Sequence, residues 1–74
     1  MKRYVKEFAR DMMNSLSNNA ACLPIRKAIE NAVRMCERGL ITERECIHYI
    51  LKQMELHLKL LFQIMQVRMI PLIQ

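Results

Sequence analysis

The sequence predicts an all-α domain of two short helices and one long C-terminal helix, completed as a bundle by dimerisation. Only one Gly and two Pro occur among 74 residues, and the commonest types favour helix. Apolar residues recur at three- and four-residue steps in three segments separated by turn signals. The third segment carries more apolar surface than so small a chain can cover. A chain of this length forms one domain, residues 1–74.

The first helix is predicted over residues 2–17, where one half of the circumference is apolar. Its apolar positions are Val5, Phe8, Ala9, Met12, Met13 and Leu16. On the opposite face Arg3, Lys6 and Arg10 lie within roughly 60° of one another. A run of Ser and Asn at 15–19 ends the helix, because such side chains compete for backbone hydrogen bonds.

The second helix is predicted over residues 24–38. Pro24 suits the first helical position, and it is expected to keep Leu23 out of the helix. The expected core residues are Ile25, Ile29, Ala32, Val33 and Cys36. On the outer face, Arg26 and Glu30 are spaced for an ion pair. A second basic set lies on one side of that face and consists of Lys27, Arg34 and Arg38.

The boundary between the second and third helices carries the clearest local signals. Gly39 stands where a helix needs a left-handed residue after its last turn. Thr42 and Glu45 have the spacing of a capping box, which starts the next helix. Ile41 and Cys46 are placed as the two halves of a hydrophobic staple.

The third helix is predicted over residues 43–70, because neither Gly nor Pro interrupts it before Pro71. Its apolar residues span roughly 240° of the circumference. One side holds Ile47, Leu51, Met54, Leu58, Phe62, Met65 and Met69. The arc continues through Tyr49, Ile50, Leu56, Leu60, Leu61, Ile64 and Val67. The helix is about 42 Å long against roughly 20–25 Å for the others, so we expect them to cover it only as far as about Met54.

The uncovered surface predicts a partner, either a second copy or another protein. A domain this small buries only about 60% of its unfolded surface. Three cysteines are an odd number and argue against a disulfide framework, so association is the remaining route to stability. We predict a homodimer in which the C-terminal halves of the third helices pair. The predicted interface residues are Leu58, Leu60, Leu61, Ile64, Met65 and Val67.

Neither a metal site nor an active site is expected. Cys36, Cys46, His48 and His57 are close in sequence, but Cys46 and His48 lie about 200° apart on a helix. The cysteines stand in apolar helical contexts that quench thiol reactivity. Motifs for phosphate binding or metal-dependent hydrolysis are missing from the sequence. We therefore expect no cofactor, no small-molecule substrate and no enzymatic activity.

The formal net charge of +5 raises the question of nucleic acid. The two basic sets, on residues 3–10 and 27–38, are best interpreted as solvated faces, and non-specific phosphate contact is the alternative. A recognition helix is disfavoured, because the third helix opens with Glu43-Arg44-Glu45. Charges, Gln and Pro71 interrupt the apolar segment 58–73, so no membrane span is predicted, and the cytoplasm is the expected location.

The function these observations favour is a non-enzymatic protein-interaction module: a small regulator, adaptor or inhibitor acting through an apolar helical face. The alternative is a basic dimeric regulator that binds nucleic acid through phosphate contacts. Small helical proteins of this style are common among phage and mobile-element inhibitors, anti-CRISPR proteins included. That comparison is an analogy of size and style, without a shared motif.

Overall fold

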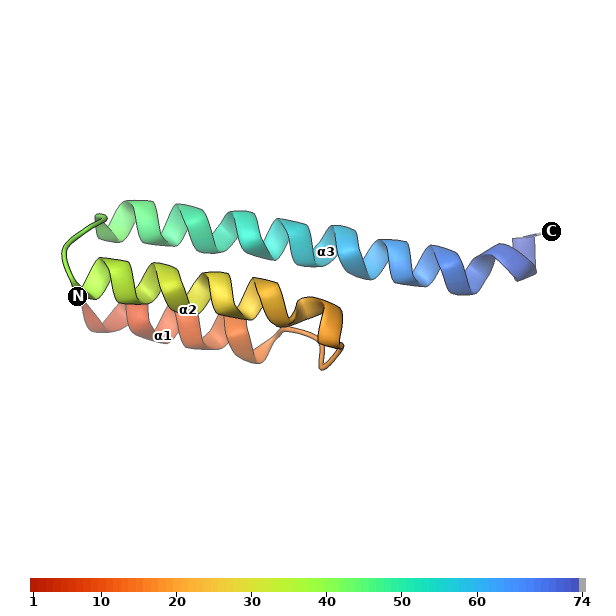
Figure 1. The fold of residues 1–74 in the computed structure, drawn as a ribbon, viewed down its shortest axis with the longest axis horizontal. Coiled ribbons are helices and arrows are strands. Elements are labelled where there is room, and N and C mark those ends of the chain that lie inside the picture. Colours follow the sequence, from red (N-terminus) through yellow and green to blue (C-terminus); the bar gives the residue numbers. More distant parts are fainter. Residues whose placement is uncertain (74) are drawn as a thin grey trace.

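Three α-helices and one 3-10 turn form the protein in a computed structural model, which describes the backbone of residues 1–73 and the side chains of residues 1–66. The elements are α1 (Arg3–Asn14), η1 (Ala20–Cys22), α2 (Leu23–Glu37) and α3 (Glu43–Ile73). α1 and α3 run in the same direction and α2 runs antiparallel to both. α1 and α2 lie side by side along the N-terminal part of α3 (Figure 1). The predicted all-α three-helix fold is confirmed.

The connection between α1 and α2 is more ordered than the sequence suggested. α1 ends at Asn14, three residues before the predicted end. The Ser15 hydroxyl donates to the Met12 carbonyl at 2.7 Å, a side-chain bond that competes with continuing the helix. The Asn19 side chain then accepts from the Ala21 N–H at 2.8 Å and caps η1. The polar run therefore both stops one helix and starts the next turn.

Two proline-related bounds differ from the predictions. α2 begins at Leu23, whose φ of −60° and ψ of −42° are helical, so Pro24 does not exclude this residue from the helix. The turn Ala20–Cys22 leads directly into α2 and outweighs the steric preference before a proline. α3 continues to Ile73, with Pro71 in its last turn, because proline raises the free energy of a helical turn without forbidding it.

The α2–α3 turn has the structure predicted for it. Gly39 has a φ of 76°, in the left-handed region. Its N–H donates to the Cys36 carbonyl at 3.0 Å, and the Leu40 N–H donates to the Met35 carbonyl at 2.9 Å. These two bonds form a Schellman motif, which satisfies carbonyls that the end of α2 would otherwise leave unpaired.

The predicted capping box at the start of α3 is also confirmed. The Thr42 N–H donates to the Glu45 carboxylate at 2.9 Å, and the Glu45 N–H donates to the Thr42 hydroxyl at 3.1 Å. Hydrogen bonding of the Glu45 carboxylate, first to the Thr42 backbone N–H and then to the Thr42 side chain, holds the pKa of Glu45 below its usual range. Ile41 and Cys46 both pack into the core, as a staple requires.

Replacing Gly39 tests this turn directly. We expect Gly39→Ala to lower the free energy of unfolding by about 1–2 kcal/mol, because an L side chain is strained at positive φ. No atom lies within 4 Å of an added Cβ, so the loss comes from the backbone alone. Urea unfolding measures it. Gly39→Asn is the matched control and should lose less; equal stability of all three proteins would contradict a left-handed Gly39.

The core lies between the three helices. It consists of Val5, Ala9, Leu16, Ile25, Ile29, Ala32, Cys36, Cys46 and Ile50. Among the residues with described side chains, one polar residue shares this interior: His57 is only 4% exposed. Its Nε2 accepts a hydrogen bond from the Ser17 N–H at 3.2 Å, so the buried imidazole ties α3 to the chain just after α1.

Polar contacts join α1 to α2, one of them in place of a predicted pair. The Arg26 guanidinium donates to the Met13 carbonyl at 3.0 Å rather than binding Glu30. It thereby satisfies a carbonyl at the C-terminal end of α1. Lys6 and Glu37 form an ion pair at 3.4 Å near the other end of the same helix pair. The Lys6 side of α1 therefore faces α2.

α3 extends well beyond the other helices, and the molecule measures 52 × 18 × 18 Å (Figure 1). The rest of the chain covers α3 beyond the predicted limit at Met54, because His57 is buried and Leu60 still packs against the core. The overhang is residues 61–73, about 20 Å of helix. The overhang is shorter than predicted, but α3 still extends past the other two helices.

Candidate interaction surface

Four large apolar side chains on α3 are more than half exposed and lie along one line of the helix. They are Leu51 (52%), Leu58 (66%), Phe62 (60%) and Met65 (57%). At 100° per residue they fall within roughly 60° of one another. They stand about 60–120° round the helix from the fully buried Ile50. We call these four residues the α3 stripe.

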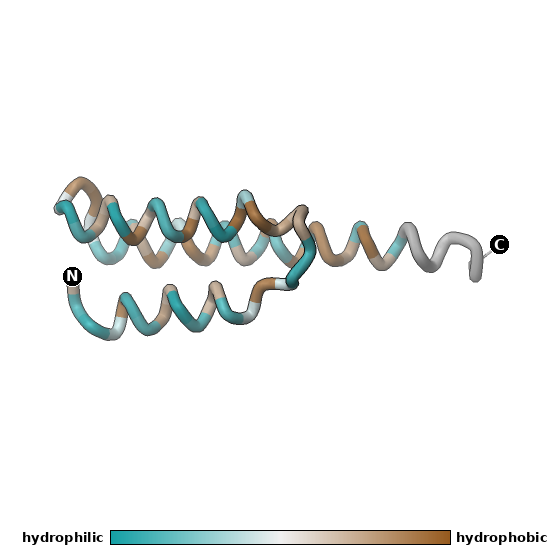
Figure 2. Tube along the Cα trace, turned by 60° about the horizontal axis from the view of Figure 1, so that its bottom comes forward, coloured by the Kyte–Doolittle hydropathy of each residue, from teal (hydrophilic) through white to brown (hydrophobic). Residues whose placement is uncertain are grey.

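The stripe continues from the three-helix part of the molecule onto the overhang. Figure 2 shows hydrophobic residues along α3 both beside the two shorter helices and beyond them. Ile47 and Met54 lie at the edge of the stripe and pack partly against the core. Leu51 is beside the bundle, whereas Phe62 and Met65 are past its last core contact at Leu60.

The predicted interface residues occupy several different environments. Leu58 and Met65 are exposed members of the α3 stripe. Leu61 and Ile64 are half-buried. Leu60 is half-buried because it packs against the core of its own chain. The sixth predicted residue, Val67, lies outside the residues whose side chains the structure describes.

Two stripe residues were not among the predicted interface residues. Leu51 lies too near the N-terminus of α3 for a C-terminal interface, and the sequence places Phe62 only in the wide apolar arc. The signal that identifies them is the spacing itself. Leu51, Leu58, Phe62 and Met65 follow steps of seven, four and three residues, which keep side chains on one line of a helix.

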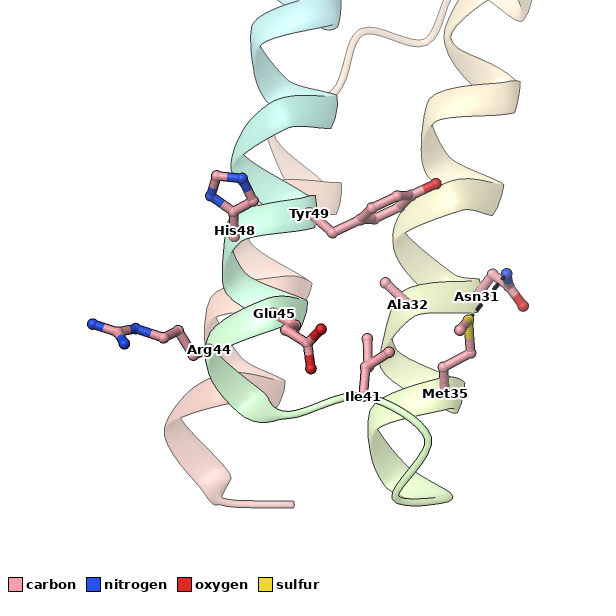
Figure 3. A pocket seen from close by; sticks show the side chains of 8 residues that line it. All are labelled: Asn31, Ala32, Met35, Ile41, Arg44, Glu45, His48 and Tyr49. Atoms are coloured by element: carbon pink, nitrogen blue, oxygen red, sulfur yellow. Dashed lines mark hydrogen bonds between the residues drawn. The ribbon is translucent and has the colours of Figure 1, made fainter.

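A hollow of about 680 Å³ lies on another flank of α3, between that helix and α2. Its lining residues are Asn31, Ala32, Met35, Ile41, Arg44, Glu45, His48 and Tyr49. Figure 3 shows Ile41, Ala32 and Tyr49 between the helices, whereas Arg44 points away. The Glu45 carboxylate is engaged in the capping box. Most of the hollow is therefore apolar, without the convergent polar groups that orient a small ligand.

The predicted basic residues are all exposed, on α1, on the outer face of α2 and, for Arg38, directly after α2. They are Arg3, Lys6, Arg10, Lys27, Arg34 and Arg38. The Arg3 guanidinium pairs with Glu7 at 3.0 Å, and Lys6 pairs with Glu37. These carboxylates partly neutralise the α1 set, so the basic surface is interrupted by negative charge.

The cysteines and histidines do not converge into a reactive group in the part of the chain with described side chains. Cys22, Cys36 and Cys46 are buried free thiols. Burial, and next the neighbouring Cys36 thiol, raise the pKa of Cys46 to about 11, which makes it a poor nucleophile at neutral pH. Among residues 1–66, no three His, Cys, Asp or Glu side chains are grouped so as to hold a metal ion.

Comparison with protein-family models, with curated proteins and with solved structures finds no match to this chain. Within the described residues, no helix combines the length and the apolarity that a membrane crossing requires.

Proposed function

We propose that this chain is a non-enzymatic protein-interaction module, a small regulator, adaptor or inhibitor that acts by binding another polypeptide through α3. The observation that carries the proposal is the α3 stripe. Leu51, Leu58, Phe62 and Met65 remain more than half exposed on one line of a helix. Contiguous exposed apolar surface of this kind marks interaction sites in folded proteins.

The shape and chemistry of the stripe suit recognition by a helix. Anchors at steps of three, four and seven residues are what an amphipathic helix offers to a groove or to another helix. Phe62 supplies a large aromatic anchor. Met65 can adapt its side chain to the shape of a partner. The three-helix core holds the N-terminal half of α3 in place, which lowers the entropy lost on binding.

The rival function is nucleic-acid binding through the basic residues of α1 and α2. Six exposed cations and a net charge of +5 favour it. The ion pairs of Arg3 and Lys6 weigh against it, because their carboxylates would meet the same phosphates. Phosphate-driven binding falls steeply as salt rises, whereas apolar docking changes little. A salt titration of any complex therefore separates the two functions.

Affinity capture with the full-length chain tests the proposal. Polypeptides retained from the native cells by the wild type are compared with those retained by Phe62→Glu. We expect this variant to lose at least about tenfold in retention, because a charge replaces a central apolar anchor. Its helix content by circular dichroism should stay unchanged, since Phe62 is largely exposed.

The matched control is Gln63→Glu, which adds the same charge at a neighbouring exposed position off the stripe. It should retain what the wild type retains, and the retention should survive high salt. The proposal fails if Phe62→Glu behaves like the control. Loss of binding in high salt and on charge reversal of Arg3, Lys6 and Arg10 would establish the rival instead.

A further inference from the structure

We infer that the occupant of the α3 stripe is a second copy of this chain, bound antiparallel, α3 against α3, with the two-fold axis beside Leu58. The inference rests on the proposed function and names the partner. It goes beyond the predicted pairing of C-terminal halves, because it assigns an orientation, a register and a different set of contacts. Surface area, residue spacing and the position of α1 support it.

The accessible surface has the excess that a dimer needs. The chain exposes 5731 Å². A folded monomeric protein of 8.8 kDa exposes about 4,800 Å², so the excess is about 900 Å². Each partner in a standard protein interface buries about 800 Å². The excess is thus similar in size to the area that each copy buries in such an interface.

The residue spacing along the stripe is the same in both directions. With half-buried Met54 included, the apolar seam is Leu51, Met54, Leu58, Phe62 and Met65. Its steps are three, four, four and three residues, symmetric about Leu58. An antiparallel copy with Leu58 facing Leu58 of the partner subunit sets Leu51 against the partner's Met65. Met54 then meets the partner's Phe62, so every position of the seam has an apolar counterpart.

α1 lies on the stripe side of α3. The Lys2 N–H donates to the Glu43 carboxylate at 2.6 Å, and Glu43 lies roughly 40–100° round α3 from the stripe residues. α2 instead lies on the other flank of α3, where residues of α2 and Tyr49 of α3 line the hollow. Tyr4, 55% exposed, lies roughly 160° round α1 from the Lys6 side that faces α2. It adds an exposed aromatic ring near the N-terminal ends of α1 and α3.

The overhang favours the antiparallel orientation over the parallel one. In an antiparallel pair, Phe62 and Met65 of each chain lie beside the partner's three-helix part, against its stripe and α1. In a parallel pair, the overhangs meet only each other, and the three-helix parts meet each other. Only the antiparallel pair places each overhang against the partner's three-helix part, where α1 can add to the apolar contact with α3.

The first test is the oligomeric state of the full chain by sedimentation at micromolar concentration. We expect a dimer for the wild type. Leu58→Glu brings two carboxylates together on the axis and should weaken dimerisation by about 100-fold. Leu56→Glu is the matched control, an exposed leucine on the other flank of α3, and it should remain dimeric. Circular dichroism should show the same helix content for all three.

Cysteine cross-linking tests the register. A mixture of Leu51→Cys and Met65→Cys chains should form a covalent dimer on mild oxidation, whereas neither variant alone should do so. The three native cysteines are buried, so they do not compete. A parallel pair gives the reverse result, with each variant cross-linking to itself, and that outcome overturns the inference.

The two proposals fail in different ways. A wild-type monomer, or a dimer unaffected by Leu58→Glu, overturns the second copy as the occupant. The proposed function still stands in that case if Phe62→Glu loses a captured protein other than this chain. If stripe variants neither change the oligomeric state nor reduce capture, both proposals are wrong.

Discussion

Ile50→Ala is expected to lower the free energy of unfolding by about 3–5 kcal/mol, the largest effect of a single substitution considered for this protein. Ile50 is 0% exposed and lies on the face of α3 that meets α1 and α2. Truncation to Ala removes buried methyl and methylene groups and leaves a cavity that packed helices fill only in part. A single core in so small a domain supplies only about 3–5 kcal/mol, so the variant should be largely unfolded at 37 °C.

Urea or thermal unfolding followed by circular dichroism measures this loss. Wild type and variant must be compared at one protein concentration, because association of folded chains raises apparent stability. Leu56→Ala is the control on the same helix, since Leu56 is 49% exposed and belongs to no core contact among the described residues. It should lose less than about 1 kcal/mol. Equal losses for the two variants would contradict the assignment of the core face of α3.

Stability is expected to fall by about 2 kcal/mol between pH 9 and pH 11 as Cys46 titrates. Burial, the neighbouring Cys36 thiol and the Glu43 carboxylate raise the pKa of Cys46 from 9.0 to about 11. Below pH 9 the thiol is protonated in both the folded and the unfolded chain, and the contribution is fully present. Above pH 9 the unfolded chain loses this proton first, so rising pH favours unfolding until the folded thiol also ionises.

Cys46→Ala isolates this effect from the other groups that titrate in the same range. The variant loses a buried sulfur and should be less stable at neutral pH, but its stability should change less between pH 9 and pH 11. The quantity to compare is the difference between wild type and variant as a function of pH, measured by urea unfolding. A difference that is constant across this range would contradict a buried, protonated Cys46.

The turn between α2 and α3 could be predicted in full because its determinants are local. Gly39 supplies the left-handed residue, and Thr42 with Glu45 supplies the reciprocal cap. Each interaction links residues within five positions of one another in sequence, so composition and spacing suffice to identify them. The all-α class could be predicted for the same reason, from propensity and periodicity.

The α1–α2 connection could not be predicted to the residue. Leu23 is helical despite preceding Pro24, because η1 delivers the chain in that conformation. Arg26 binds the Met13 carbonyl rather than the carboxylate one turn away. For Leu23 the preceding turn overrides the preference before a proline. For Arg26 a carbonyl brought close by the fold competes with a local ion pair worth less than about 1 kcal/mol, and the contact between helices prevails.

Composition and periodicity are enough to predict that the protein is helical, where one helix gives way to the next, and that α3 carries an apolar arc too wide for its neighbours to cover. How that arc is divided between core and surface depends on the packing of the three helices. This packing buries the side that contains Ile50 and His57, pairs the imidazole with the Ser17 N–H, and leaves Leu58 and Phe62 in water. The physical reason is that periodicity records which residues share a side of one helix, whereas burial depends on where the other helices lie. A polar residue such as His57 interrupts a pattern of apolar positions, yet its hydrogen bond to a distant backbone lets it occupy the core.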